Sequence, residues 1–242
     1  LKFVFDNIIS LKRSAFNYKL SGKVKKSKIE LFETIKNNFN IREIKQIFLS
    51  DTQVELDVSK KNYKIDVDGK YSFNNQDFLQ LEIDGNLKGE LLKIIASFDY
   101  KDYFDLDLIN YKKPKSEIAK ISVEFEKNKN IFNLRKLDFK EKNNLFSFNN
   151  LKFKNNKFES FKTINISTRN NNFSIQWDKK ITIKGSKFDA TNLHKILNQQ
   201  GTKNKFDKIN NNIEIEFKNI KVPLSENLEN FRLIGEIKKG KF

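Results

Sequence analysis

Apolar and polar residues alternate along most of the chain from residue 53 onward. In the stretch 121–126, isoleucine, valine and phenylalanine alternate with serine and glutamate, and in 213–217 isoleucine and phenylalanine alternate with glutamate. The same period recurs over 54–58, 63–67 and 104–108. A period of two places apolar side chains on one face of a β-strand and polar side chains on the other. The pattern therefore predicts a mainly β protein, built as a long, twisted, antiparallel meander sheet.

Turn residues separate these segments at the spacing expected of a meander. Asp68-Gly69 and Asp84-Gly85 have the composition of hairpin turns. Asparagine tolerates the left-handed conformation and is expected to form further turns. These turns are expected at Asn74-Asn75, Asn128 to Asn130, Asn143-Asn144, Asn155-Asn156 and Asn170 to Asn172. No linker rich in Pro, Gly or Ser divides the chain, so we expect one continuous β-rich segment over residues 1–242.

Two segments carry helical signals instead. Asp189 is suited to cap a short helix near residues 189–200, which Gly201 would terminate. Its apolar stripe would consist of Leu193, Ile196 and Leu197. A second short helix is predicted near residues 28–38, where Ser27 precedes apolar residues at helical spacing.

The apolar faces of so many strands have few predicted elements to cover them. Such faces either pack on one another, as in a sandwich or barrel, or line a surface that binds an apolar partner. Burial of apolar area stabilises by about 25 cal/mol per Å2, which favours a closed sheet unless lipid replaces the second layer. Two hypotheses follow: an open, curved apolar groove, and a sealed core.

The net charge of +16 raises the question of a nucleic-acid partner. Lysine, asparagine, isoleucine and phenylalanine are all abundant, as a genome poor in G and C would produce. The lysines are spread over nearly every segment, and the aromatic residues lie on the apolar faces, away from them. We therefore interpret the charge as a solvated surface and expect no nucleic-acid partner. A nucleic-acid-binding β domain and an anionic membrane surface remain as lower alternatives.

The residues that carry most catalytic and metal chemistry are scarce in this chain. His194 is the only histidine and there is no cysteine, so a histidine-rich or thiolate metal site is excluded. No nucleophile motif accompanies His194, and neither a calcium loop nor a phosphate-binding loop has its required spacing. We expect a protein that is not an enzyme and has no cofactor.

The chain contains no run of about 18 apolar residues, so no membrane span is predicted within it. Because the chain begins at Leu1 and contains no methionine, we expect a segment of a longer protein.

The stretch 181–190, Ile-Thr-Ile-Lys-Gly-Ser-Lys-Phe-Asp-Ala, followed by Leu193 and Leu197, resembles the AsmA-like proteins of bacterial envelopes, in particular their large YhdP-type members. That group shows a strand, a glycine, a Phe/Leu-Asp-Ala sequence and a short leucine-bearing helix. The resemblance covers roughly residues 120 to 242. It implies that Gly185, Phe188, Asp189, Leu193 and Leu197 form a structural motif.

The resemblance also implies a function. AsmA-like proteins are anchored in the inner membrane, lie in the periplasm, and are thought to pass phospholipids between the inner and outer membranes along an apolar β-groove. The chain would then be a non-enzymatic lipid-transfer module, tethered to the inner membrane by an anchor outside this segment. The alternative is a structural β domain of the envelope with a sealed core. Alternation and the resemblance together assign the groove lining to Ile65, Val67, Leu81, Ile83, Phe104, Leu106, Leu108, Ile121, Val123, Phe125, Ile164, Ile166, Phe173, Ile175, Trp177, Ile181, Ile183, Ile213, Ile215 and Phe217.

Overall fold

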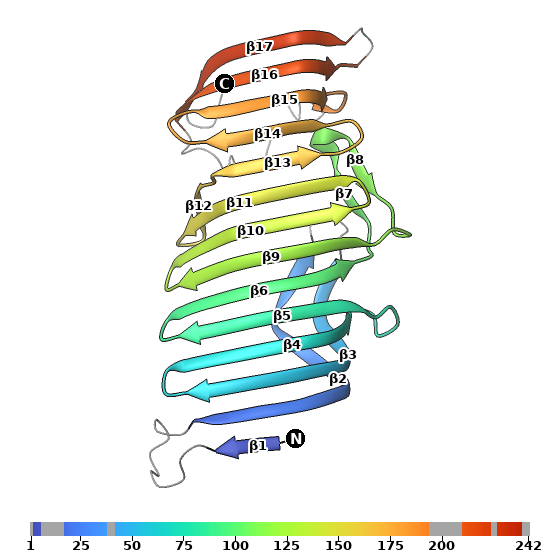
Figure 1. Ribbon diagram of the computed structural model, residues 1–242. Helices are drawn as coiled ribbons and strands as arrows, with labels where there is room; N and C mark the ends of the chain where they lie inside the picture. Colours follow the sequence, from blue (N-terminus) through green and yellow to red (C-terminus); the bar gives the residue numbers. More distant parts are fainter. Residues whose placement is uncertain (1, 6–16, 38–41, 194–209, 224–226, 239–242) are drawn as a thin grey trace. The chain divides into compact units, whose positions relative to one another are not determined.

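The computed structural model describes residues 2–5, 17–37, 42–193, 210–223 and 227–238. Fifteen strands form one sheet, and its edge strands, β1 and β17, do not pair with each other, so the sheet is not closed (Figure 1). The prediction of a mainly β, antiparallel meander is confirmed. The strands are β1 (Lys2–Phe5), β2 (Tyr18–Asn37), β3 (Arg42–Ser59), β4 (Asn62–Ser72), β5 (Leu79–Lys88), β6 (Leu91–Tyr100), β9 (Ala119–Asn128), β10 (Ile131–Glu141), β11 (Asn144–Lys154), β12 (Lys157–Ser160), β13 (Thr163–Ser167), β14 (Asn172–Trp177), β15 (Ile181–Asp189), β16 (Asn211–Lys221) and β17 (Leu228–Ile237).

A small hairpin is inserted after β6. It consists of β7 (Phe104–Leu106), the 3-10 helix η2 (Asp107–Ile109) and β8 (Tyr111–Lys113), and its two strands pair only with each other. Packing divides the chain into two compact units. Unit 1 contains residues 1–101 and 118–135, and unit 2 contains residues 102–117 and 136–242, so the inserted hairpin belongs to unit 2.

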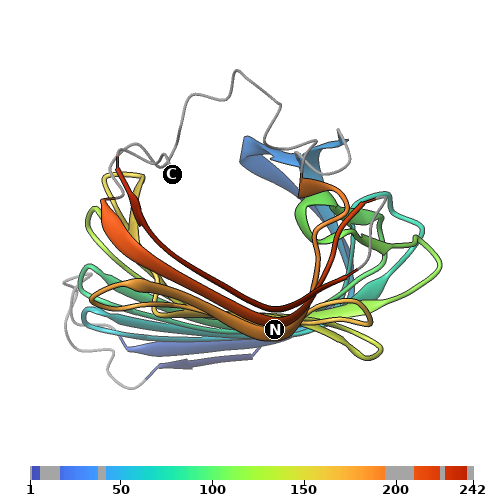
Figure 2. The same ribbon diagram turned by 90° about the horizontal axis from the view of Figure 1, so that it is seen from above.

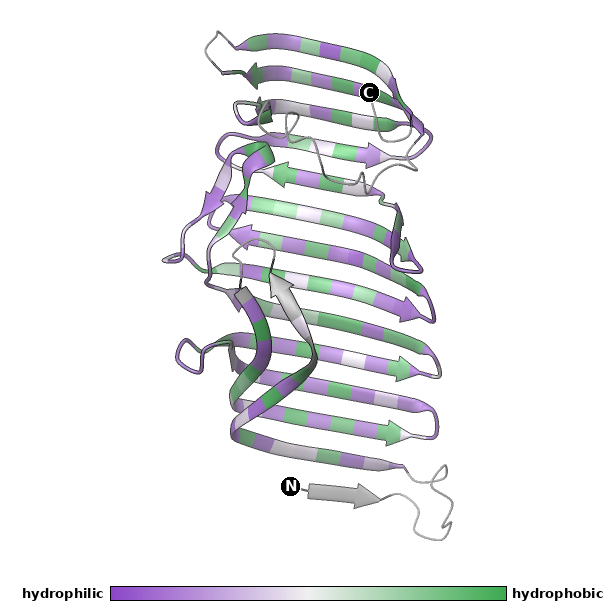
Figure 3. Ribbon diagram, turned by 180° about the vertical axis from the view of Figure 1, so that it is seen from behind, coloured by the Kyte–Doolittle hydropathy of each residue, from purple (hydrophilic) through white to green (hydrophobic). Residues whose placement is uncertain are grey.

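Unit 1 is a run of antiparallel hairpins whose register brings apolar residues into rows across the strands. Val67 of β4 pairs with Ile83 of β5, Ile83 with Ala96 of β6, and Ala96 with Val123 of β9. Because paired residues project to the same face, the alternation within each strand becomes one apolar face across the unit. Figure 3 shows the alternation as bands of two colours along the strands.

The predicted helix near 28–38 is wrong, since Tyr18–Asn37 is the long strand β2. Ile29 and Leu31 alternate with Lys28 and Glu30, and Ile29 pairs with Ile47 of β3. The period of two and the backbone hydrogen bonds to β3 favour a strand here. They outweigh the helical spacing of the apolar residues, because an isolated short helix has no surface to pack on. β2 and β3 extend past the end of β4, and their outer parts bend around one face of unit 1 as a two-stranded ribbon (Figures 1, 2 and 3).

The dipeptides Asp68-Gly69 and Asp84-Gly85 do not form hairpin turns, contrary to the prediction. They lie inside β4 and β5, where Asp68 pairs with Glu82 and Gly85 with Ile65. A side chain at Gly69 would collide with Thr52, and one at Gly85 with Ile65, so close packing requires glycine there. The predicted asparagine turns agree better with the structure, since Asn75, Asn155 and Asn156 have positive φ.

Unit 2 continues the antiparallel pattern up to β15. β15 then pairs in parallel with β16, with Ile181 opposite Ile213 and Asp189 opposite Lys221, so both strands begin at the same end of the sheet. Of the predicted helix near 189–200, Phe188 and Asp189 lie in β15, and a turn follows in which the Leu193 backbone N–H donates to the Ala190 carbonyl at 3.0 Å. Residues 194–200, including His194 and Leu197, are outside the described residues.

Candidate functional site

The apolar face of unit 1 is built from rows of side chains that run across its strands. One row consists of Val54, Val67, Ile83, Ala96 and Val123, which are paired one to the next. A neighbouring row consists of Leu20, Leu56, Ile65, Gly85, Ile94 and Phe125. Burial along these rows is uneven: Ala96 is 9% exposed, whereas Ile65 is 37% exposed. The face is therefore contiguous and apolar, and part of it contacts solvent.

One end of this face carries an aromatic cluster. The ring of Tyr71 makes edge contacts with Phe73 and Phe98, at centroid distances of 5.2 and 6.0 Å. The Tyr71 hydroxyl donates to the backbone carbonyl of Asp99 at 2.6 Å, so a deeply buried phenol has a partner. Burial raises the pKa of Tyr71 well above its usual range.

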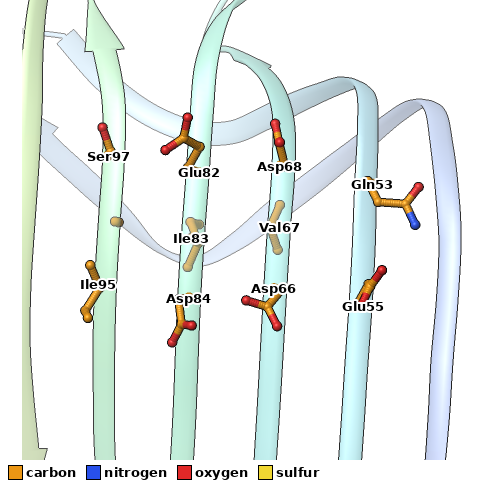
Figure 4. Close-up of a pocket in the computed structure, with 11 residues that line it drawn as sticks. Gln53, Glu55, Asp66, Val67, Asp68, Glu82, Ile83, Asp84, Ile95 and Ser97 are labelled. Carbon is orange, nitrogen blue, oxygen red and sulfur yellow. The ribbon is translucent and has the colours of Figure 1, made fainter.

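The opposite face of unit 1 is polar and acidic. Figure 4 looks onto this face, where Asp66, Asp84 and Glu82 line a shallow depression that also contains Ile95. The carboxylates alternate in sequence with the apolar rows, as the period of two requires. Within the described residues no group of three or more His, Cys, Asp or Glu side chains has a geometry suited to a metal ion. The depression offers no chemistry beyond a negatively charged surface.

The apolar face of unit 2 has the same construction. A first row consists of Phe148, Ile164, Ile175, Ile183, Ile215 and Leu233. A second row consists of Phe146, Ile166, Phe173, Gly185, Phe217 and Phe231. The second row is the more deeply buried, with Phe146 at 2% and Phe217 at 3% exposure. Phe188 stacks on Phe217 at 5.3 Å between ring centroids, which helps to bury it.

Gly185 of the predicted structural motif lies within this second row. A side chain at Gly185 would collide with Phe173 and with the backbone of Asn172. The glycine thus permits close approach of β14 and β15, and neither a turn nor a positive φ is involved.

Most of the predicted lining residues do share a face within their own unit. In unit 1 these are Ile65, Val67, Leu81, Ile83, Ile121, Val123 and Phe125. In unit 2 they are Ile164, Ile166, Phe173, Ile175, Trp177, Ile181, Ile183, Ile213, Ile215 and Phe217. Trp177 lies at the margin of its face. Its ring packs on Phe161 and Phe158, at distances of 5.3 and 5.9 Å between ring centroids.

Three predicted lining residues lie elsewhere. Phe104, Leu106 and Leu108 were expected to alternate along a strand of the sheet, but β7 ends at Leu106 and η2 follows. Leu108 is 48% exposed, and Phe104 packs on Tyr111 of the same inserted hairpin and on Phe139 of β10. Sequence alternation over so short a stretch did not distinguish a covering hairpin from a strand of the sheet.

The inserted hairpin covers part of the apolar face of unit 2. Tyr111 of β8 is 6% exposed and packs on Phe146 at 4.7 Å and on Phe139 at 6.3 Å between ring centroids. Its hydroxyl donates to Glu141 at 3.1 Å, and burial with this carboxylate raises the pKa of Tyr111 above its usual range. The role of Tyr111 as a covering residue was not predicted, because its position between Asn110 and Lys112 offers no periodic signal.

Polar contacts at the base of the hairpin include a buried lysine. The Lys113 side chain is fully buried, and its ammonium donates to the carbonyls of Asp102 at 2.9 Å and Pro114 at 3.1 Å. Burial lowers the pKa of Lys113, against the opposing charges of Glu141 and Asp102. These contacts hold the hairpin in place and are not arranged around a cavity.

Asp189, the predicted helix cap, is fully buried at the end of β15. Its Oδ1 accepts from the Thr191 backbone N–H at 3.2 Å and from the Thr191 hydroxyl at 2.6 Å, as a capping carboxylate does. Burial by itself would raise the pKa of Asp189. Hydrogen bonds from Thr191 and Asn110, with the charge of Lys221, outweigh it and hold the pKa below its usual value.

No helix among the described residues has the length and apolarity needed to cross a membrane. Comparisons of the chain with family models, with curated proteins and with solved structures find no match.

Proposed function

We propose that the chain is a non-enzymatic lipid-binding module whose apolar sheet faces hold the acyl chains of phospholipids. The observation that carries the proposal is the set of apolar rows that cross the strands of each unit and are only partly covered. In unit 1, Tyr63 and Ile65 are 44% and 37% exposed, although both project to the apolar face. Contiguous exposed apolar surface is costly in water and marks a binding surface.

An acyl chain suits such a face better than a compact ligand does. The rows cross several strands, and most of their side chains are aliphatic or phenylalanine. Non-directional apolar contact along a long surface is the interaction that hydrocarbon chains offer. The resemblance of residues 181–190 to AsmA-like proteins supports placing this module between the inner and outer membranes, where it would pass phospholipids from one to the other.

A structural module with a sealed core is the second candidate. It is favoured by one observation: the hairpin 102–117 already buries Phe146 and Phe139 of unit 2. If a further layer covers the remaining rows in the same way, no lipid site exists.

Charge placed on the apolar face separates the two candidates. The full chain would be purified as wild type and as Val123→Asp and Ile166→Asp, and bound lipid would be measured by mass spectrometry beside a thermal melt. Ser122→Asp and Ser167→Asp are matched controls, since each adds the same charge on the polar face of the same strand. We expect the apolar-face variants to remain folded and to lose copurifying phospholipid, because a desolvated charge in an acyl path is costly, while both controls retain it. Wild-type protein without lipid, together with unfolding of both apolar-face variants, would favour the sealed core.

A further inference from the structure

Lysines gather at one end of the strands in unit 1, where hairpin turns follow one another. These turns join β3 to β4, β5 to β6, and β9 to β10 (Figure 1). We call their lysines the basic edge of unit 1: Lys60, Lys61, Lys88, Lys127 and Lys129. The Gly89 backbone N–H donates to the Lys61 carbonyl at 3.0 Å, so the first two turns lie against each other. Neighbouring strands lie about 4.8 Å apart, which spaces successive turns by roughly 10 Å.

Most of these lysines have no acidic partner within the described part of the chain. Lys129 pairs with Glu90 at 3.3 Å. Among the residues that the structure describes, Lys60, Lys61, Lys88 and Lys127 form no ion pair, and all four are exposed. At the opposite end of the same strands, Lys101 bonds to Asp77 at 2.8 Å.

Unit 2 also carries lysines at its strand ends. At the turns after β11, β12 and β14, the lysines without an ion pair among the described residues are Lys154, Lys157, Lys162 and Lys179. Lys180, beside them, is neutralised by Glu214. At the opposite strand ends Lys142 pairs with Glu117 at 2.7 Å and Lys221 with Asp189 at 3.8 Å. The opposite strand ends of unit 2 also carry cations without an ion pair among the described residues, such as Arg169 and Lys187, so unit 2 has no such asymmetry.

The basic edge of unit 1 adjoins the apolar face directly. Lys127 is two residues beyond Phe125 on β9 and pairs with Leu92, which puts it at the end of a row on that face. The same row contains Leu87 and the half-exposed Tyr63. An apolar surface bordered by a tyrosine and by free ammonium groups matches the junction of an acyl chain with a phosphate headgroup.

We infer that the basic edge of unit 1 binds the phosphate of a lipid whose acyl chain lies on the adjoining apolar face. The inference rests on the proposed function and adds to it a preference for phosphate-bearing, anionic lipids. Uncompensated lysines at regular spacing repel one another, and an anionic group among them relieves that repulsion. Two lysines, Lys61 and Lys127, represent the site, because Lys61 lies in the turn before Tyr63 and Lys127 ends the row that contains Leu87 and Leu92. Lys88 pairs with Asn62 and Leu91 and projects to the polar face.

The test uses three probes with the full chain at low ionic strength: lysophosphatidic acid, a monoacylglycerol with the same acyl chain, and glycerol 3-phosphate. The first has both the chain and the phosphate, the second lacks the phosphate, and the third lacks the chain. The edge variant is Lys61→Gln, Lys127→Gln. Its matched control is Lys64→Gln, Lys120→Gln, which removes the same charge from the polar face of unit 1.

We expect the wild type and the control to bind lysophosphatidic acid about tenfold more tightly than the monoacylglycerol, which corresponds to about 1.4 kcal/mol. The edge variant should lose this preference while binding the monoacylglycerol unchanged, and added salt should reduce the preference because exposed charges are screened. Glycerol 3-phosphate alone should bind weakly.

Four outcomes overturn the inference. Equal wild-type affinity for the two lipids, or a preference that survives in the edge variant, refutes the headgroup site and leaves the proposed function standing. Binding of neither lipid refutes both. Tight binding of glycerol 3-phosphate alone, with no gain from the acyl chain, would identify a site for free phosphate.

Discussion

The side-chain amide of Asn171 donates a hydrogen bond to the backbone carbonyl oxygen of Ile109 at 2.8 Å, although 62 residues separate them. The Asn171 Oδ1 in turn accepts the backbone N–H of Asp189 at 2.8 Å. Asn171 is 1% exposed, so one buried amide joins η2 of the inserted hairpin to the end of β15. This contact holds the hairpin against the sheet of unit 2.

Replacement of Asn171 by alanine should therefore destabilise the protein by about 2 kcal/mol, because it leaves a buried carbonyl and a buried N–H without partners. The free energy of unfolding in urea measures the effect. Asn172→Ala is the control, since Asn172 is exposed and its replacement should change the stability by less than about 0.5 kcal/mol. Equal effects of the two substitutions would show that Asn171 does not anchor the hairpin.

Gly85→Ala should destabilise unit 1 by about 1–3 kcal/mol through overpacking. The new Cβ would lie 2.6 Å from Ile65 Cγ2 and 3.0 Å from Ile94 Cδ1. Ile65→Ala removes the nearer atom, so the double variant should be less destabilised than the sum of the two single variants. Strictly additive free energies in this cycle would contradict the close approach of β4 and β5 at this glycine.

Asp189 should make the stability of unit 2 fall at low pH. Its folded pKa lies below the unfolded value of about 3.9, so its contribution is complete above that pH and is lost as pH falls through the folded pKa. Asp189→Asn removes this titration while keeping a hydrogen-bonding side chain. The difference in unfolding free energy between wild type and Asp189→Asn should be constant above about pH 5 and shrink below pH 4; a difference independent of pH would exclude a depressed pKa.

The two partners at the Tyr111–Glu141 contact should differ in the cost of their removal. Tyr111→Phe deletes one hydroxyl donor and should cost about 1 kcal/mol. Glu141→Leu should cost more, because it leaves both the Tyr111 hydroxyl and the amide of Asn144, which donates to Glu141 at 2.6 Å, without an acceptor. Thermal melts of the two variants measure this order, and a reversed order would mean that Glu141 is dispensable.

Binding to duplex DNA should be weak, independent of sequence and steeply reduced by salt, despite the charge of +16. The structure spreads many lysines over polar faces, where several pair with acids, as Lys93 does with Glu126 at 2.9 Å and Lys184 with Glu216 at 2.8 Å. Fluorescence anisotropy with labelled DNA at two salt concentrations tests the expectation. Submicromolar, sequence-selective binding at physiological salt would reverse the ranking of lipid over nucleic acid.

The sequence by itself determined the strands and their two faces. Alternation is a local property, so Ile121 to Phe125 and Ile213 to Phe217 identify their apolar sides without knowledge of any partner strand. The same property makes the shared face of Val67, Ile83 and Val123 predictable once the strands pair in order.

Only the tertiary structure decided which local signals prevail. Asp68-Gly69 has the composition of a turn, but contact of Gly69 with Thr52 of β3 explains why a glycine lies inside a strand. The segment 28–37 has helical spacing, but β3 supplies the hydrogen-bond partners that make it a strand. Segment 104–108 alternates like a strand of the sheet, yet it belongs to an inserted hairpin whose Tyr111 packs on Phe139 and Phe146. In each case the deciding contact comes from residues distant in the chain, which local composition and periodicity do not encode.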